Sequence, residues 1–202
     1  STDESVEIIK RYSSDIDYWV SEADNGQYHA ISKGFERAKG DVLCWINSDD
    51  ILMPGSLSAV AKAFSMFDAD VVFGNLLYID GSDNLIREMR NTPMIKLGYL
   101  YRAGFGLSQP EVFWSHALYS KVGGINIEGT FAMDDDLFFR FIRAGAKFKH
   151  ISENLSALRF HEDTKTSKMS EIGDLESEKI RSSLIFGQSK IFRKILRVLV
   201  WI

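Results

Sequence analysis

The chain has 202 residues, of which 45% are hydrophobic and 26% are charged, so its length and composition are those of one globular domain with or without an appendage. The formal net charge of −4 gives no global basic field, which excludes nucleic acid as an expected partner. The single cysteine, Cys44, excludes an internal disulfide framework and fits a reducing compartment such as the cytoplasm.

Helices and strands are expected to alternate in the first half of the chain. Helices are expected where capping residues or proline precede an apolar stripe of helical period, at residues 4–12, 27–39 and 56–67. Strands are expected at short apolar runs, at residues 16–20, 42–46, 70–73, 76–79 and 85–89, with the last two forming a hairpin. The alternation predicts an α/β fold with a mainly parallel central sheet, in which 42–46 is buried on both faces.

The second half is less regular, but its elements can be placed. Strands are expected at residues 111–114, 147–151 and 155–160, and helices at 115–121 and 134–144. A helix or helix pair is expected from residue 175 onward. We expect one α/β domain over residues 1–168 and a C-terminal helical tail over 169–202.

Two adjacent acids, Asp49 and Asp50, follow the apolar run 42–46. The carboxyl end of a buried strand is the edge where open α/β sheets bind ligands. Adjacent carboxylates repel each other unless a cation neutralises them, and Mg²⁺ prefers carboxylates together with substrate phosphates. The alternative is an ordinary pair of capping acids before the helix that Pro54 precedes.

Four segments that surround these acids resemble the core of family 2 glycosyltransferases. They are Ser-Glu-Ala-Asp-Asn-Gly at 21–26, Ala-Ile-Ser-Lys-Gly at 30–34, Ala-Lys-Gly-Asp at 38–41 and Ile-Asn-Ser-Asp-Asp at 46–50. The resemblance implies a GT-A fold, a nucleotide diphosphate-sugar donor and Mn²⁺ or Mg²⁺ as cofactor. It implies Asp49 as a metal ligand with Asp50 beside it, while Asn47 stands where many members carry the first Asp of an Asp-x-Asp motif. The donor-site residues that it implies are Asp3, Asp24, Gly26, Lys33, Asn47, Ser48 and Asp49.

Further segments, at 109–114, 122–125 and 132–140, resemble the acceptor half of the same family. By this resemblance Asp134 is the general base, Gln109 and Asp135 lie on the acceptor side, and His161 ligates the metal or touches the diphosphate. The alternative for residues 134–136 is an acidic first helical turn that the helix dipole favours. Asp136 and Arg140 are four residues apart and are expected to form an ion pair.

Family members open with a strand, a turn and an Asp-rich loop, and residues 1–4 look like the tail of that loop. We therefore expect the first strand–helix–strand unit to be absent. Its absence would weaken donor binding and leave sheet edges open to self-association, so a homo-oligomer is one expectation.

Residues 189–202 combine Lys190, Arg193, Lys194 and Arg197 with an apolar run. A basic amphipathic helix of this kind can lie on the inner face of a membrane, although it is too short to span one. The alternative is a helix packed on its own domain or on a dimer partner.

The resemblance implies an enzyme that transfers a sugar, with inversion and with a divalent metal, to a hydroxyl of a glycan or lipid-linked acceptor in polysaccharide biosynthesis. The competing hypothesis is a degenerate domain that binds nucleotide without turnover. A nucleotidyltransferase is a third reading, but no Gly-rich basic loop supports it.

Overall fold

The computed structural model describes residues 3–93, 107–127, 132–160 and 175–176. The helices are α1 (Ser5–Arg11), η1 (Ser13–Asp15), α2 (Gln27–Arg37), α3 (Ser56–Met66), η2 (Gln109–Glu111), α5 (His116–Lys121) and α6 (Met133–Arg143). The strands are β1 (Val42–Leu43), β2 (Ile51–Leu52), β3 (Val71–Ile79), β4 (Leu85–Met89), β5 (Val112–Ser115) and β6 (Phe148–Arg159).

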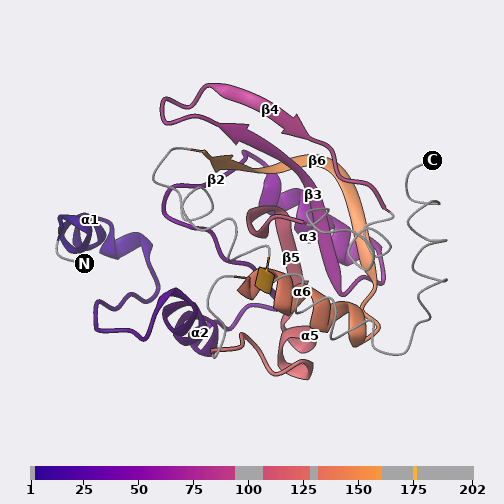
Figure 1. The fold of residues 1–202 in the computed structure, drawn as a ribbon, viewed down its shortest axis with the longest axis horizontal. Helices are drawn as coiled ribbons and strands as arrows, with labels where there is room; N and C mark the ends of the chain where they lie inside the picture. The colour runs from indigo at the N-terminus through magenta and orange to yellow at the C-terminus, as the bar shows by residue number, and fades with distance from the viewer. Residues whose placement is uncertain (1–2, 94–106, 128–131, 161–174, 177–202) are drawn as a thin grey trace.

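The described strands form one curved sheet in the order β1-β5-β3-β6-β2, with β4 paired to the second half of β3 (Figure 1). The α/β class is confirmed, and the parallel pairing predicted for the centre of the sheet is present as β3–β6, the longest of the pairings. The pairings of β1, β2, β4 and β5 are antiparallel, so the sheet is mixed.

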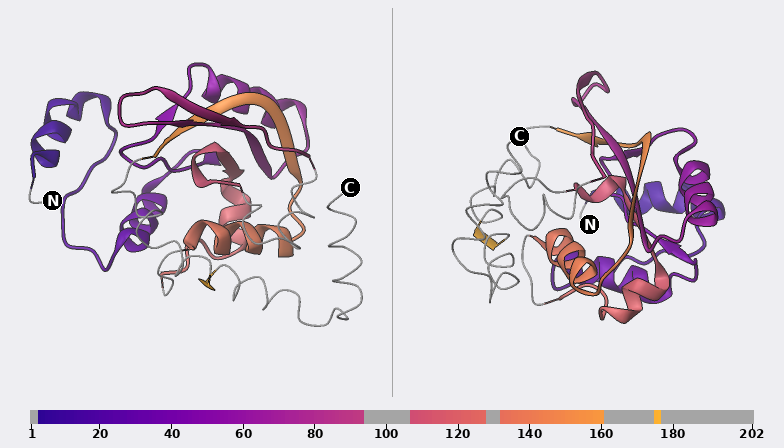
Figure 2. Two further views of the ribbon diagram at one scale, coloured as in Figure 1. Left: turned by 45° about the horizontal axis from the view of Figure 1, so that its top comes forward. Right: turned by 90° about the vertical axis from the view of Figure 1, so that its right-hand side faces the viewer.

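The sheet is covered on both faces, which explains why its central strand β3 is almost wholly apolar. Side chains of β3 alternate between the two layers: Val71 and Phe73 pack with Phe35, Trp114 and helices α5 and α6, whereas Val72 packs with Val60 of α3. The two views in Figure 2 show α3 on one side of the sheet and α6 on the other.

The helices lie where their sequence signals predict them. Ser115 caps α5 by accepting a hydrogen bond from the backbone N–H of Leu118 at 3.1 Å. The apolar stripe of α2 reaches the core through Ile31 and Phe35, whereas Ala30 is exposed. Helix α6 carries three acids in its first turn and ends before Gly145, whose φ of +79° is the left-handed value that favours glycine.

Several sequence predictions of strands are wrong in extent. Residues 16–20 form no strand, because they lie beside none of the described strands and their side chains are only partly buried or exposed. The strand expected over 42–46 is reduced to β1, and 44–46 continue without regular pairing. Segments 70–73 and 76–79 merge into β3, as 147–151 and 155–160 merge into β6, because the two long strands pair along their length.

The expected tail lies outside the described residues, apart from 175 and 176. Among the helices of the described part, none is long and apolar enough to cross a bilayer.

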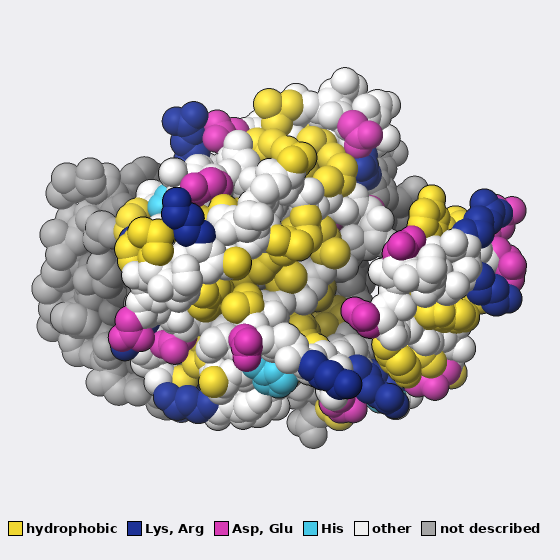
Figure 3. All heavy atoms as spheres, turned by 180° about the vertical axis from the view of Figure 1, so that it is seen from behind, with side chains coloured by type: hydrophobic (Ala, Val, Ile, Leu, Met, Phe, Trp, Pro, Cys, Tyr) yellow, Lys and Arg dark blue, Asp and Glu magenta, His cyan; other side chains and the backbone are white. Residues whose placement is uncertain are grey.

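Figure 3 shows the face behind the sheet, where α3 lies and where apolar side chains gather at the surface. Leu57, Met66 and Phe67 are exposed on or just after this helix. Self-association stays a prediction, and the outer edge of β1 pairs with no described strand.

Gly74 marks the point where β6 passes closest to β3. A Cβ atom added to Gly74 would lie 2.5 Å from Cγ of Leu155 and 2.6 Å from the backbone oxygen of Glu153. We expect Gly74→Ala to lower the free energy of unfolding by about 1–3 kcal/mol, since a buried strand must move to admit the methyl group. Urea denaturation checks this. Gly81→Ala is the matched control, because its Cβ would meet nothing within 4 Å; equal losses in the two variants would contradict the prediction.

Candidate functional site

The acidic loop, residues 47–50, follows β1 and is closed by contacts within itself. The backbone N–H of Asp50 donates to the carbonyl oxygen of Asn47 at 3.2 Å, and Nδ2 of Asn47 donates to Oδ2 of Asp50 at 3.1 Å. Gln27, the first residue of α2, donates from Nε2 to Oδ1 of Asn47 at 3.3 Å. The side-chain carbonyl of Asn47 therefore accepts a hydrogen bond from the protein, at the position where the resemblance led us to expect an Asp.

Both carboxylate oxygens of Asp50 accept hydrogen bonds from the protein. Oδ1 accepts from the backbone N–H of Arg159 at 3.1 Å, and Oδ2 accepts from Asn47. Burial raises the pKa of Asp50, while these two hydrogen bonds oppose the rise. The metal role predicted for Asp50 stays a prediction, and its contacts are those of a residue that shapes the loop.

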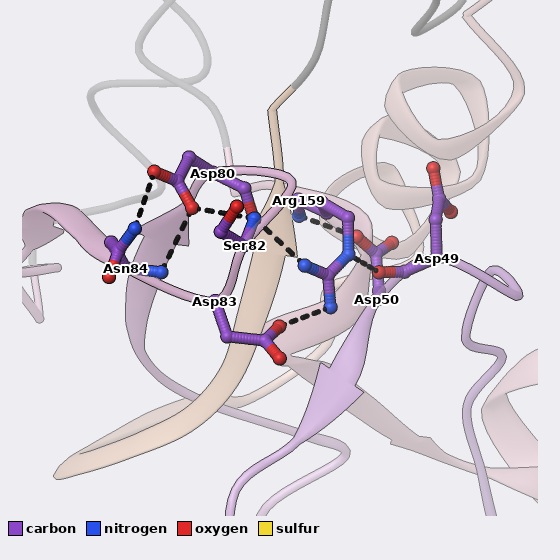
Figure 4. A network of polar contacts seen from close by, with 7 residues as sticks. All are labelled: Asp49, Asp50, Asp80, Ser82, Asp83, Asn84 and Arg159. Carbon is purple, nitrogen blue, oxygen red and sulfur yellow. Dashed lines mark hydrogen bonds and ion pairs between the residues drawn. The ribbon is translucent and has the colours of Figure 1, made fainter.

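Asp49 has a different orientation from Asp50. Its backbone oxygen accepts from Nε of Arg159 at 2.9 Å, and Figure 4 shows its carboxylate directed away from the Arg159 network. Among the described residues no three His, Cys, Asp or Glu side chains group as a metal site. A single carboxylate still fits Mg²⁺ or Mn²⁺ chemistry, because such ions often complete their shell with substrate phosphates and water.

The buried element η2 connects this loop to the other half of the site. Nδ2 of Asn47 also donates to Oε1 of Gln109 at 3.2 Å, and Nε2 of Gln109 donates to the carbonyl oxygen of Trp45. Gln109, expected to line the acceptor side, is 6% exposed. Its contacts fix η2 against the acidic loop.

Glu111, at the other end of η2, was not singled out by the sequence patterns. It is the only charged side chain in the buried part of the described structure. Oε1 accepts from the backbone N–H of Ser108 at 2.8 Å, and Oε2 has no hydrogen-bond partner among the described residues. Burial raises the pKa of Glu111 to about 8, and the charge of Asp134 adds to the rise. Glu111 therefore lies within electrostatic reach of the predicted base.

The first turn of α6 contains Asp134, Asp135 and Asp136, all partly buried. The ion pair predicted within α6 is confirmed: Asp136 binds Arg140 at 2.7 Å. Arg140 also donates to the carbonyl oxygens of Val122 and Gly124, which anchors α6 to the preceding loop. Asp136 therefore has a structural contact, and the roles predicted for Asp134 and Asp135 stay predictions.

The predicted donor-site residues before β1 form a second cluster. Lys33 of α2 makes ion pairs with both Glu22 and Asp24, which together raise the pKa of Lys33. Gly26 is the N-cap of α2 and has a φ of +105°. Nδ1 of His29, also on α2, lies 3.6 Å from Oδ1 of Asp24 and belongs to the same cluster.

Three further residues of the predicted site remain to be placed. Ser48 is exposed on the acidic loop. Oδ1 of Asp3 accepts a hydrogen bond from the backbone N–H of Ser5 at 3.1 Å, at the start of α1, and Figures 1 and 2 show α1 set apart from the sheet. His161 lies outside the described residues.

Comparison with solved structures identifies the fold. Residues 1–349 of Staphylococcus aureus TarS, crystallised with UDP-GlcNAc, match with a TM-score of 0.71 at 16% identity, over 97% of this chain and 58% of that one. The mannosyltransferase PcManGT of Pyrobaculum calidifontis, in complex with GDP-Man and Mn²⁺, matches with a TM-score of 0.63 at 13% identity, over 98% of this chain and 56% of that one. The chain has the GT-A glycosyltransferase fold.

The sequence also matches the family described as Glycosyl transferase family 2 over residues 1–122, and the chain belongs to that family. An uncharacterized glycosyltransferase of Nostoc sp. is 32% identical over 43% of this chain and 28% of its own length. One from Mycobacterium tuberculosis is 25% identical over 69% of this chain and 53% of its own length. The chain thus spans about half or less of the curated relatives that it matches.

Proposed function

We propose that this domain transfers a sugar from a nucleotide diphosphate-sugar to an acceptor hydroxyl with the help of a divalent cation. One observation carries the proposal: η2 holds the acidic loop through Gln109 at one end, and Glu111 at its other end interacts electrostatically with Asp134. A donor region and a base are thereby joined by one buried element. The donors in the matched TarS and PcManGT structures, UDP-GlcNAc and GDP-Man, support the donor class.

On the donor side, Asp49 holds the cation, and Asn47, Ser48 and the cluster around Asp24 and Lys33 surround the nucleotide. The cation, when bound, neutralises the diphosphate and stabilises the charge that develops on it as it leaves. Asp50 contributes by fixing the loop rather than by adding a second strong ligand, since both its oxygens accept protein hydrogen bonds.

On the acceptor side, Asp134 takes the proton from the acceptor hydroxyl. The oxygen then forms a bond to the anomeric carbon as the bond to the diphosphate oxygen breaks, and the nucleoside diphosphate leaves. A single base without a nucleophilic carboxylate gives inversion at the anomeric carbon. We propose a glycan or a lipid-linked acceptor at the cytoplasmic face of a membrane.

Asp49→Ala should abolish donor turnover. Removing the one projecting carboxylate of the acidic loop removes the charge that holds the cation, so we expect release of nucleoside diphosphate to fall by about 100-fold or more. A coupled assay with UDP-sugars and GDP-mannose in Mn²⁺ measures it.

Asp68→Ala is the matched control for that assay, because Asp68 is an exposed acid whose partner is Lys147. Equal turnover by the two variants would contradict the assignment of Asp49. Nucleotide binding without turnover by the unaltered protein would favour a degenerate binding module instead.

A further inference from the structure

Arg159, the last residue of β6, contacts three separate segments of the chain. Nε donates to the backbone oxygen of Asp49 at 2.9 Å, Nη1 donates to the backbone oxygen of Asp80 at 2.9 Å, and Nη2 pairs with Oδ1 of Asp83 at 2.7 Å. Its own backbone N–H donates to Asp50 at 3.1 Å. Figure 4 shows the guanidinium between the acidic loop and the β3–β4 turn.

These contacts fix the peptide that joins Asp49 to Asp50. The guanidinium is planar and presents its donors in a rigid fork, so acceptors that it binds together keep a fixed relation to one another. The side chain of Arg159 is only 19% exposed, which limits competition from water. With this peptide held, the Cα–Cβ bond of Asp49 keeps its direction, which restricts where the carboxylate can lie to the few side-chain rotamers of that backbone.

The β3–β4 turn holds its own shape without Arg159. Oδ1 of Asp80 accepts from the backbone N–H groups of Ser82 and Asn84 at 2.8 and 2.9 Å, and Oδ2 accepts from the Asn84 side chain at 3.0 Å. Asp83 adopts a left-handed conformation with a φ of 67°, which is uncommon outside glycine and is best tolerated by Asn and Asp. The turn is therefore a preformed support to which Arg159 is anchored.

We propose that Arg159 is a positioning residue of the donor site: anchored on the β3–β4 turn through Asp83, it holds the Asp49 carboxylate in the orientation that binds a divalent cation. This inference rests on the proposed function, since it assigns to Arg159 a role in the same site. The partners that orient a metal ligand affect metal affinity without touching the metal.

Arg159→Lys tests the inference, because lysine keeps the charge but lacks the rigid, planar fork of donors with which the guanidinium reaches three separate segments. Calorimetric titration with UDP and Mn²⁺ should give a Kd about 10- to 100-fold higher than that of the unaltered protein, at an unchanged stoichiometry. Asp83→Asn, which keeps a residue suited to the left-handed conformation, should give a smaller increase of about 2- to 5-fold, because it removes only the charge of the anchor. Arg90→Gln, which removes an exposed cation after β4, should leave Kd unchanged.

The two measured quantities, the Kd and the stoichiometry of binding, distinguish a positioning role of Arg159 from a purely structural one. If Arg159 only supported the fold, the fraction of binding-competent protein would fall while Kd stayed constant, and the inference would be overturned. An unaltered protein that binds neither UDP nor GDP in the presence of Mn²⁺ would overturn the proposed function itself, and the inference with it. Normal binding by the unaltered protein with an equal Kd in Arg159→Lys would overturn the inference alone.

Discussion

Asp134→Asn should lower the turnover number by about 100- to 10,000-fold while leaving the Kd for the nucleotide nearly unchanged. The substitution keeps the shape of the side chain and removes its ability to accept a proton, and positioned proton transfer contributes about this much to enzymatic rates. The turnover number should change rather than the Kd for the nucleotide, because the proposed base acts on the acceptor and not on the nucleotide. Steady-state kinetics with a donor that the protein turns over measure it.

Asp136→Asn, in the same helical turn, is the matched control. Asp136 is occupied by its ion pair with Arg140, so its loss should lower the melting temperature and leave the turnover number of the folded protein within about twofold. Near-normal turnover by Asp134→Asn, or an equal loss in both variants, would remove Asp134 from the role of base.

Glu111 should make the protein less stable as pH rises from about 4.5 to about 8. Its pKa is 4.5 in the reference state and about 8 when folded, so the folded protein binds a proton that the unfolded chain releases in this interval. Stability is therefore full below pH 4.5 and falls as pH approaches 8, by at most an amount on the order of 4 kcal/mol. Urea denaturation between pH 4.5 and pH 8 measures the fall.

Glu111→Gln should flatten this pH dependence, because the amide is neutral in both states. The exposed acid Glu7 of α1 supplies the control, and Glu7→Gln should leave the curve unchanged. Parallel stability curves for the unaltered protein and Glu111→Gln would show that Glu111 is ionised in the folded protein, contrary to the expectation from its burial.

The helices of this fold could be predicted from the sequence, and its long strands only in part. Helices α3 and α6 lie within about a residue of their predicted bounds, because caps, period and glycine stops are local signals. Residues 16–20 have the composition of a strand but lie beside none of the described strands, and strand formation depends on a partner that composition does not specify. The merging of predicted strands into β3 and β6 has the same cause, since pairing across the sheet overrides local breaks such as Gly74.

The candidate site could be predicted where it follows local motifs. The acidic loop and the first turn of α6 were found in this way, and the structure relates them through Gln109 and Glu111. Glu111 and Arg159 were missed. The burial of Glu111 and the contacts of Arg159 with three segments both depend on residues far apart in the chain. No pattern within η2 distinguishes a buried glutamate from an exposed one.

The departure of Asn47 from the acidic motif has a physical explanation in the structure. Its amide donates to Asp50 and Gln109 and its carbonyl accepts from Gln27, which makes three protein contacts. An aspartate at this position could not donate to either acceptor. Asn47 therefore joins the acidic loop, α2 and η2, and in the proposed function the negative charge that binds the cation comes mainly from Asp49.

The central claim is that the acidic loop of this chain binds a nucleotide diphosphate through a divalent cation. Calorimetric titration of the protein with UDP and with GDP, each in Mn²⁺ and in EDTA, tests it most directly. We expect one nucleotide to bind in Mn²⁺ and to lose its affinity in EDTA. Absence of binding by a folded protein with either nucleotide, or equal binding in Mn²⁺ and EDTA, would contradict the claim.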